Sequence, residues 1–118
     1  MLSLTPATKI FLASQPVDMR KGIDGLSSLV RHVLEQNPFS GHLFVFYGRR
    51  RDRIKILTWD CGGFVLYTKR LERGHFLLPE RREGAVSREI EPFDLQLILA
   101  GLEPCQQRRQ KFWQPPAA

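Results

Sequence analysis

A run of basic residues between two predicted strands is the feature of this sequence with the clearest chemistry. Residues 48–55 read Gly-Arg-Arg-Arg-Asp-Arg-Ile-Lys, and the longer segment 49–88 holds eleven basic and five acidic side chains. This segment carries the whole formal net charge of +6, because basic and acidic residues cancel in the rest of the chain. Such a local excess of positive charge favours a polyphosphate backbone as the partner.

Eight of these basic side chains are predicted to contact DNA phosphates from a cationic ridge on paired strands, with little sequence preference. They are Arg49, Arg50, Arg51, Arg53, Lys55, Lys69, Arg70 and Arg73. A solvated basic loop is the alternative interpretation, because short basic clusters are not specific for nucleic acid.

Four aspartates are the residues to consider for metal-dependent phosphodiester chemistry. Each has a structural explanation: Asp18 is placed to cap a helix, Asp24 lies on a helix surface, Asp52 falls in a turn and Asp60 precedes a chain reversal. The spacings of a serine hydrolase, a zinc protease or a P-loop are also missing from the sequence. We therefore predict a protein that is not an enzyme and has no catalytic residues.

The cysteines and histidines do not form a metal-binding pattern. Cys61 and Cys105 stand far apart, and the three histidines are scattered, whereas a zinc site needs about four ligands in close pairs. Free thiols in a cytosolic protein are preferred over a disulfide. We expect no metal, no cofactor and no small-molecule substrate.

Length and composition describe one globular domain. The chain has 118 residues, 42% of them hydrophobic and 25% charged, which is ordinary for a globular protein. Its apolar runs are too short to cross a bilayer and no signal peptide is recognisable, so we expect a cytoplasmic protein without a membrane partner. We assign residues 1–102 to a single domain and residues 103–118 to a flexible basic tail.

Hydrophobic periodicity predicts an α+β fold. A short strand at 9–13 precedes an amphipathic helix at 18–35, which Asn37-Pro38 ends. The period then changes to two, and further strands are expected at 43–47, 53–60, 64–71 and, as an edge, 86–91. Pro92 opens a short C-terminal helix. We predict an antiparallel sheet of about four strands with the main helix packed on one face.

The reversal at Cys61-Gly62-Gly63 predicts a β-hairpin in one of two registers. With all three residues in the loop, Lys55 faces Lys69; with Gly62-Gly63 alone, Lys55 faces Arg70. Both registers place like charges opposite each other, which is unfavourable unless a ligand relieves it.

Aromatic residues accompany the cations on these strands. In the first register Trp59 lies on the face of Arg53 and Lys55, and Tyr67 and Lys69 project from the same face. Base stacking beside phosphate contacts is one interpretation. Core packing of Trp59 and Tyr67, with the lysines extending to the rim, is the preferred one.

Several segments resemble one known family in order and spacing. They are Asp18 to Leu26 (Asp-Met-Arg-Lys-Gly-Ile-Asp-Gly-Leu), Phe44 to Leu57, Trp59 to Phe64 and Lys69 to Phe76. Together they are similar to the insertion-sequence accessory proteins called TnpB, of the IS-sixty-six class, over about residues 10–101. The resemblance implies an auxiliary role in bacterial DNA transposition, with strand transfer performed by a separate transposase, and it carries over no catalytic residues.

Two functions remain open at this point. The first is a non-catalytic accessory factor that binds DNA at transposon ends through the basic hairpin. The second is a protein-interaction subunit that docks on the transposase or on a sister accessory protein, with Phe112-Trp113 or the edge strand as anchors.

Overall fold

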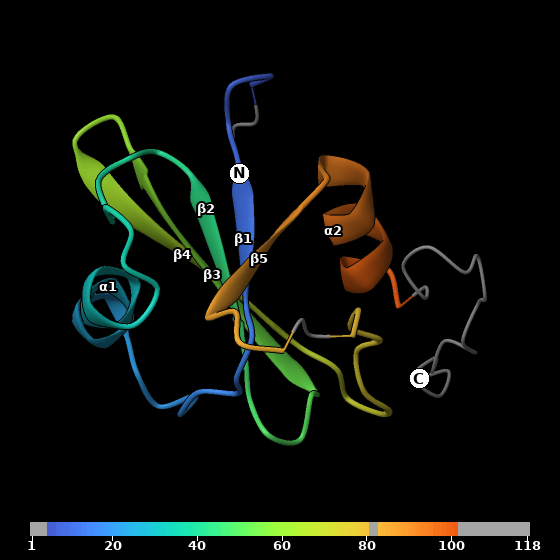
Figure 1. The fold of residues 1–118 in the computed structure, drawn as a ribbon. Helices are drawn as coiled ribbons and strands as arrows, with labels where there is room; N and C mark the ends of the chain where they lie inside the picture. The colour runs from blue at the N-terminus through green and yellow to red at the C-terminus, as the bar shows by residue number, and fades with distance from the viewer. Residues whose placement is uncertain (1–4, 81–82, 102–118) are drawn as a thin grey trace, which may run out of the picture.

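A computed structural model describes residues 5–80 and 83–101 of the chain, and Figure 1 shows their arrangement. The five strands are β1 (Ile10–Ala13), β2 (Leu43–Tyr47), β3 (Arg53–Asp60), β4 (Gly63–Arg70) and β5 (Ser87–Ile90). The two helices are α1 (Ile23–His32) and α2 (Pro92–Leu99). Within the described ranges, neither helix has the length and apolarity that a membrane crossing requires.

The strands form one sheet in the order β4-β3-β2-β1-β5. The predicted α+β class is confirmed, with a main helix and a short C-terminal one. The sheet has five strands and is mixed, because β1 pairs with β2 in parallel while the other neighbours are antiparallel. The parallel pair follows from α1, whose crossover returns the chain to the end of the sheet at which β1 begins, so that β2 runs in the same direction beside it.

The sheet is buried on both faces, with one helix on each (Figure 1). On the α1 face, Leu26 and Val30 of the helix pack against Phe44, Phe46 and Leu57. The opposite face, covered by α2, uses the alternate residues of the same strands; these include Val45, Ile54, Ile56, Leu95 and Ile98. Because β2 meets a core on both sides, all five of its residues are buried.

Helix α1 is shorter than the predicted 18–35, and Asp18 does not cap it. The helix begins at Ile23 behind an extended Gly22, which lacks a side-chain cap. The Asp18 carboxylate instead accepts a hydrogen bond from the Arg20 amide at 2.9 Å, a local turn that competes with helix. At the other end, Glu35 adopts a left-handed φ of 55°, which stops the helix before Asn37.

The β3–β4 hairpin adopts neither predicted register. Asp60 pairs with Gly63, so its loop contains only Cys61 and Gly62, with φ values of 44° and 88°. Two consecutive positive φ values define a type I′ turn, whose twist matches that of the strands. Lys55 consequently faces Thr68, and the like-charge pair is Arg53 opposite Arg70.

Candidate nucleic-acid interface

The basic turn between β2 and β3 is held by backbone hydrogen bonds on both sides. The Arg51 amide donates to the Gly48 carbonyl at 2.9 Å, and Arg51 has a left-handed φ of 57°. The segment that follows β4 supports the turn from outside: Leu71 N–H donates to Asp52 O at 2.7 Å and Phe76 N–H donates to Arg51 O at 2.6 Å. The turn therefore presents its arginines from a fixed backbone.

The loop from Pro16 to Arg20 lies beside this turn and carries its own ion pair. Arg20 Nη2 and Asp18 Oδ2 are 2.7 Å apart, and Arg20 Nε donates to both carboxylate oxygens. This fork, with the Arg20 amide bond, holds the pKa of Asp18 well below its ordinary value. It also raises the pKa of Arg20. The negative charge of Asp18 is therefore already paired with the positive charge of Arg20.

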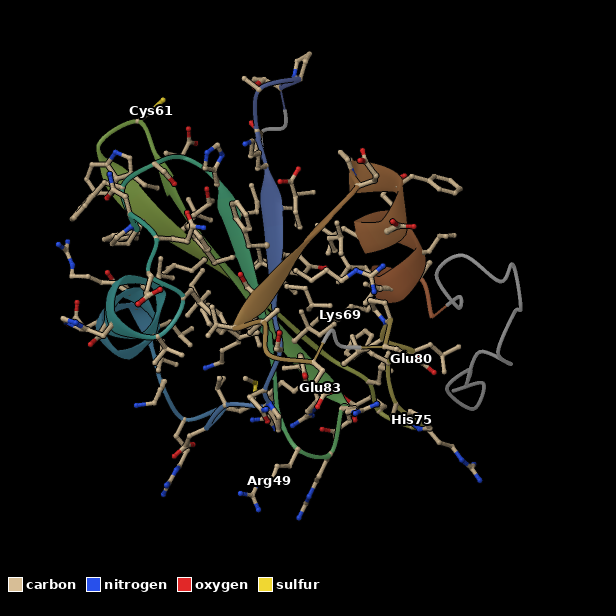
Figure 2. The ribbon with its side chains drawn as sticks, viewed as in Figure 1. Arg49, Cys61, Lys69, His75, Glu80 and Glu83 are labelled. Atoms are coloured by element: carbon tan, nitrogen blue, oxygen red, sulfur yellow. The ribbon has the colours of Figure 1, made fainter. Side chains whose placement is uncertain are left out.

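Between the loop and the turn lies a cleft of about 670 Å³, which we name the basic cleft. It is lined by residues 16–20, 48–50, 52 and 53. The charged residues of this lining are Arg20, Arg49, Arg50 and Arg53, together with Asp18 and Asp52. Figure 2 shows Arg49 directed outward from the turn, at the end of the sheet opposite Cys61.

A glycine sets the closeness of the two cleft walls. Val17 N–H donates to Tyr47 O at 2.9 Å, which joins the loop to the end of β2. Next to this bond, a Cβ added to Gly48 would lie 2.7 Å from Met19 Cγ. Only glycine lets the Met19 side chain rest on the backbone here without displacement.

A second depression of about 460 Å³ adjoins the cleft through their shared residue Arg53. We name it the hairpin hollow; it is lined by Arg53, Lys55, Thr68, Arg70 and Glu72. Its like-charge pair, Arg53 opposite Arg70, is relieved in part by a 3.0 Å ion pair between Arg70 and Glu72. This pair is solvent-exposed and contributes little to stability.

The eight predicted phosphate-binding residues do not form one ridge. Arg49, Arg50, Arg53, Lys55 and Arg70 line the cleft or the hollow. Lys69 lies on the α2 face of the sheet, opposite to the hollow, because it pairs with Ile54, whose side chain belongs to the core on that face. Arg51 lies over the Tyr47 ring at 6.0 Å, and exposed Arg73 lines neither depression.

Both lysines of the hairpin are held by backbone carbonyls, on opposite faces. Lys55 Nζ donates to Lys21 O at 2.8 Å, just before α1. Lys69 Nζ donates to Leu99 O at 2.7 Å, at the last residue of α2. The Lys69 ammonium group thus complements the carbonyl end of α2, whereas Lys55 is held by the Lys21 carbonyl at the N-terminal end of α1. The two lysines lie on opposite faces because the register differs by one residue from the one that placed them together.

The two aromatic residues also separate. Trp59 is half-buried and packs with Phe39 and Phe64, each ring 5.0 Å from the indole. It belongs to neither core cluster, so it does not pack in the core as predicted. Tyr67 pairs with Ile56, lies on the α2 face and remains 37% exposed. The predicted shared face of Trp59, Tyr67 and Lys69 is therefore wrong, since it depended on the three-residue loop.

Of the aspartates considered for metal-dependent chemistry, two lie in the same cleft. Asp18 and Asp52 both line the basic cleft, whereas Asp60 lies beside the hairpin turn at the other end of β3. Among residues 5–80 and 83–101, no three side chains of His, Cys, Asp or Glu converge in a way that would hold a metal ion. Cys61 is an exposed free thiol, and the Asp60 carboxylate raises the pKa of this thiol.

Sequence reasoning missed the loop wall of the cleft. Arg20 and Met19 were assigned to the first turn of a helix, although both belong to the Asp18–Leu26 segment that carries the family resemblance. An Asp two residues before an Arg, followed by two glycines, was the available signal for a side-chain-stabilised loop. Cys105, Phe112-Trp113 and the predicted tail at 103–118 lie outside the described residues.

These features define a small α+β protein with a five-stranded mixed sheet and a cationic cleft at one end. The profile of the family described as "IS66 Orf2 like protein" matches residues 8–109, and the chain belongs to this family. Membership supports an accessory role in insertion-sequence transposition.

Two curated relatives come from Sinorhizobium fredii (strain NBRC 101917 / NGR234): "Uncharacterized protein y4jC" and "Uncharacterized protein y4hO". Each is 36% identical to this chain over 115 residues. The matches cover 98% of this chain and 97% and 96% of the two relatives, respectively. No solved structure matches the chain significantly.

Proposed function

We propose that this protein is a non-catalytic accessory factor of transposition that binds the DNA backbone in the basic cleft. The observation that carries the proposal is that Arg49, Arg50 and Arg53 all line one cleft. The Asp18 carboxylate in the same cleft is already paired with Arg20, so it opposes an incoming phosphate less than its position suggests. The cleft therefore offers an excess of planar donors suited to phosphate oxygens.

The expected mode of binding is electrostatic and largely independent of sequence. The hairpin hollow extends the cleft through Arg53 and adds Lys55 and Arg70. About five phosphate contacts along this path would give a slope near −4.5 for log affinity against log salt concentration. Trp59 packs away from this path, so the proposal does not include base stacking.

The chemistry of strand transfer is assigned to the separate transposase. The Asp18 carboxylate is paired with the Arg20 guanidinium, and Asp52 is the other acidic residue among the described residues that line the cleft. A two-metal phosphodiester site would require further acidic ligands. Magnesium-dependent nicking by the pure protein, abolished by Asp52→Asn, would contradict the non-catalytic assignment.

A titration with matched variants tests the DNA proposal. Fluorescence anisotropy of labelled insertion-end duplex is measured with the wild type and with the triple variant Arg49→Ala, Arg50→Ala, Arg53→Ala. Loss of three contacts lowers the steepness of the salt slope by about 2.7. The control variant Lys9→Ala, Arg31→Ala, Arg73→Ala removes the same charge from exposed positions outside the cleft.

Equal loss of affinity in both variants would show that net charge, and not the cleft, binds DNA. The same two variants are titrated with purified transposase and with the sister accessory protein. If the cleft variant retains DNA binding and loses only one of these protein partners, the DNA proposal is refuted and the docking alternative replaces it.

A further inference from the structure

The two edges of the sheet differ in how they limit pairing with another strand. Edge strand β5 has four residues and carries Arg88 and Glu89. Edge strand β4 has eight residues, no proline, and charges only at its last two positions, Lys69 and Arg70. Short, charged edges resist association, whereas a long uncharged edge is a template for another strand.

The hydrogen-bond pattern identifies which groups of β4 face outward. Leu71 N–H donates to Asp52 O, so residues 71, 69, 67, 65 and 63 form the hydrogen-bonded pairs with β3. The intervening residues, Phe64, Leu66, Thr68 and Arg70, direct their N–H and C=O groups away from the sheet. Among the described residues, no hydrogen bond reaches these outward backbone groups.

We propose that the β4 edge pairs antiparallel with β4 of a second copy of this chain, with Tyr67 of each copy opposite Tyr67 of the other. Outward groups must meet outward groups, which restricts the register to alternate positions. Centring the two-fold axis on Tyr67 brings all four outward residues into hydrogen-bonded pairs, over residues 64 to 70. Leu66 then pairs with Thr68 of the second copy, and Phe64 pairs with its Arg70.

The side chains fit this register and disfavour a parallel one. The Arg70 guanidinium meets the Phe64 ring of the second copy, a cation–π pairing, and Lys69 lies opposite Val65. In-register parallel pairing would instead set Lys69 against Lys69 and Arg70 against Arg70, which like-charge repulsion opposes. Tyr67 is 37% exposed on the α2 face and its partner ring would cover it.

The geometry has one consequence for the molecule as a whole. A two-fold axis that relates antiparallel strands runs perpendicular to the sheet, so both copies of α1 lie on the same side. Arg53, Lys55 and Arg70 project from that face, so the hairpin hollows of both copies would open on one side of a continuous sheet. The pairing itself does not depend on DNA binding.

Proline substitutions at outward positions test the pairing while sparing the ladder within the chain. Thr68→Pro removes an outward N–H and places the ring against the incoming strand, which edge positions tolerate in the monomer. Glu89→Pro is the matched control, because Glu89 is an exposed residue of β5 whose backbone N–H faces away from β1. This direction follows from the bond of Ser14 N–H to Val86 O, since hydrogen-bonded and outward residues alternate along the strand. Sedimentation velocity of the full chain should give twice the 13.7 kDa monomer mass for the wild type and Glu89→Pro, and the monomer mass for Thr68→Pro.

Cysteine cross-linking tests the register and stays informative if Thr68→Pro fails to fold. In a Cys61→Ser, Cys105→Ser background, Tyr67→Cys should form a disulfide-linked dimer on mild oxidation, because the directly opposed residues of such a pair are the closest. Thr68→Cys should remain unlinked. A wild type that stays monomeric up to high micromolar concentration overturns the proposal. The proposal is also overturned if Glu89→Pro sediments as a monomer while Thr68→Pro remains a dimer. Cross-linking of Thr68→Cys but not of Tyr67→Cys would overturn it as well.

Discussion

Gly48→Ala should destabilise the protein through a single contact, and removal of that contact should reverse the sign of the effect. The added methyl group would lie 2.7 Å from Met19 Cγ, well inside van der Waals contact. Cγ is in the middle of the Met19 side chain, so relief requires a new χ1 rotamer or movement of the loop. Overpacking of this kind costs roughly 1–3 kcal/mol.

The opposite sign is expected when Met19 is truncated. The backbone at Gly48 is not left-handed, so alanine fits its conformation without strain. At such positions Gly→Ala stabilises a protein by about 0.4–1 kcal/mol, because the unfolded chain loses freedom. In a Met19→Ala background, Gly48→Ala should therefore raise stability, and the coupling energy between the two sites should be about 2 kcal/mol.

Urea unfolding of four proteins measures this cycle: the wild type, each single variant and the double variant. The midpoints should shift without a change in the slope m. DNA affinity is measured in parallel, because displacement of Met19 alters the wall of the basic cleft. An effect of Gly48→Ala that is the same in both backgrounds would refute the close contact as its cause.

Three further predictions concern the hairpin turn and the cleft loop. Cys61→Asn should raise the free energy of unfolding by about 0.5–1 kcal/mol over a Cys61→Ser control. Asparagine tolerates the left-handed conformation, which costs most other residues about 1–2 kcal/mol. Equal stabilities of the two variants would argue against a type I′ turn. In a Cys105→Ser background, Asp60→Asn should accelerate alkylation of Cys61 by iodoacetamide, because Asp60 raises the pKa of the thiol; an unchanged rate would reject that coupling. The Asp18 carboxyl should titrate by NMR below its ordinary value, and Arg20→Ala should return its pKa toward that value. Because the pKa of Asp18 is lower in the folded state, its contribution to stability is fully present above about pH 4, the pKa in the unfolded chain, and is lost as the pH falls toward the pKa in the folded state. If Arg20→Ala leaves the pKa of Asp18 unchanged, Arg20 is not the cause of the depression.

The elements were predictable because the sequence reports burial directly. Alternation in β3 and the apolar stripe of α1 each fix which side chains face a core. Strand β3 forms where the pattern predicts it, and α1 forms over Ile23–His32 of the predicted 18–35. The parallel pairing of β1 with β2 was not predictable from the same signals. This pairing depends on where the crossover helix returns the chain, and no residue pattern in the strand at 43–47 indicates that β1 is its partner.

The candidate site was predictable only in part, and the misplacement of Lys69 traces to one residue. Cys61 adopts a left-handed φ of 44° without being glycine, so the glycine pair at 62–63 suggested a loop displaced by one position. A one-residue change of register moves every side chain of β4 to the opposite face. Lys69 therefore left the predicted ridge, while Arg49 and Arg50, which belong to a turn, were unaffected.

The position of β1 in the sheet bears on how the chain assembles as it is synthesised. Ile10 pairs with Leu43 on one side and with Ile90 on the other, so β1 joins segments separated by most of the domain. Strands β2, β3 and β4 are consecutive neighbours, and their contacts close short loops, which form fastest. We expect amide protons of these three strands to become protected from exchange early during refolding, and those of β5 last, once the chain to Ile90 is in place.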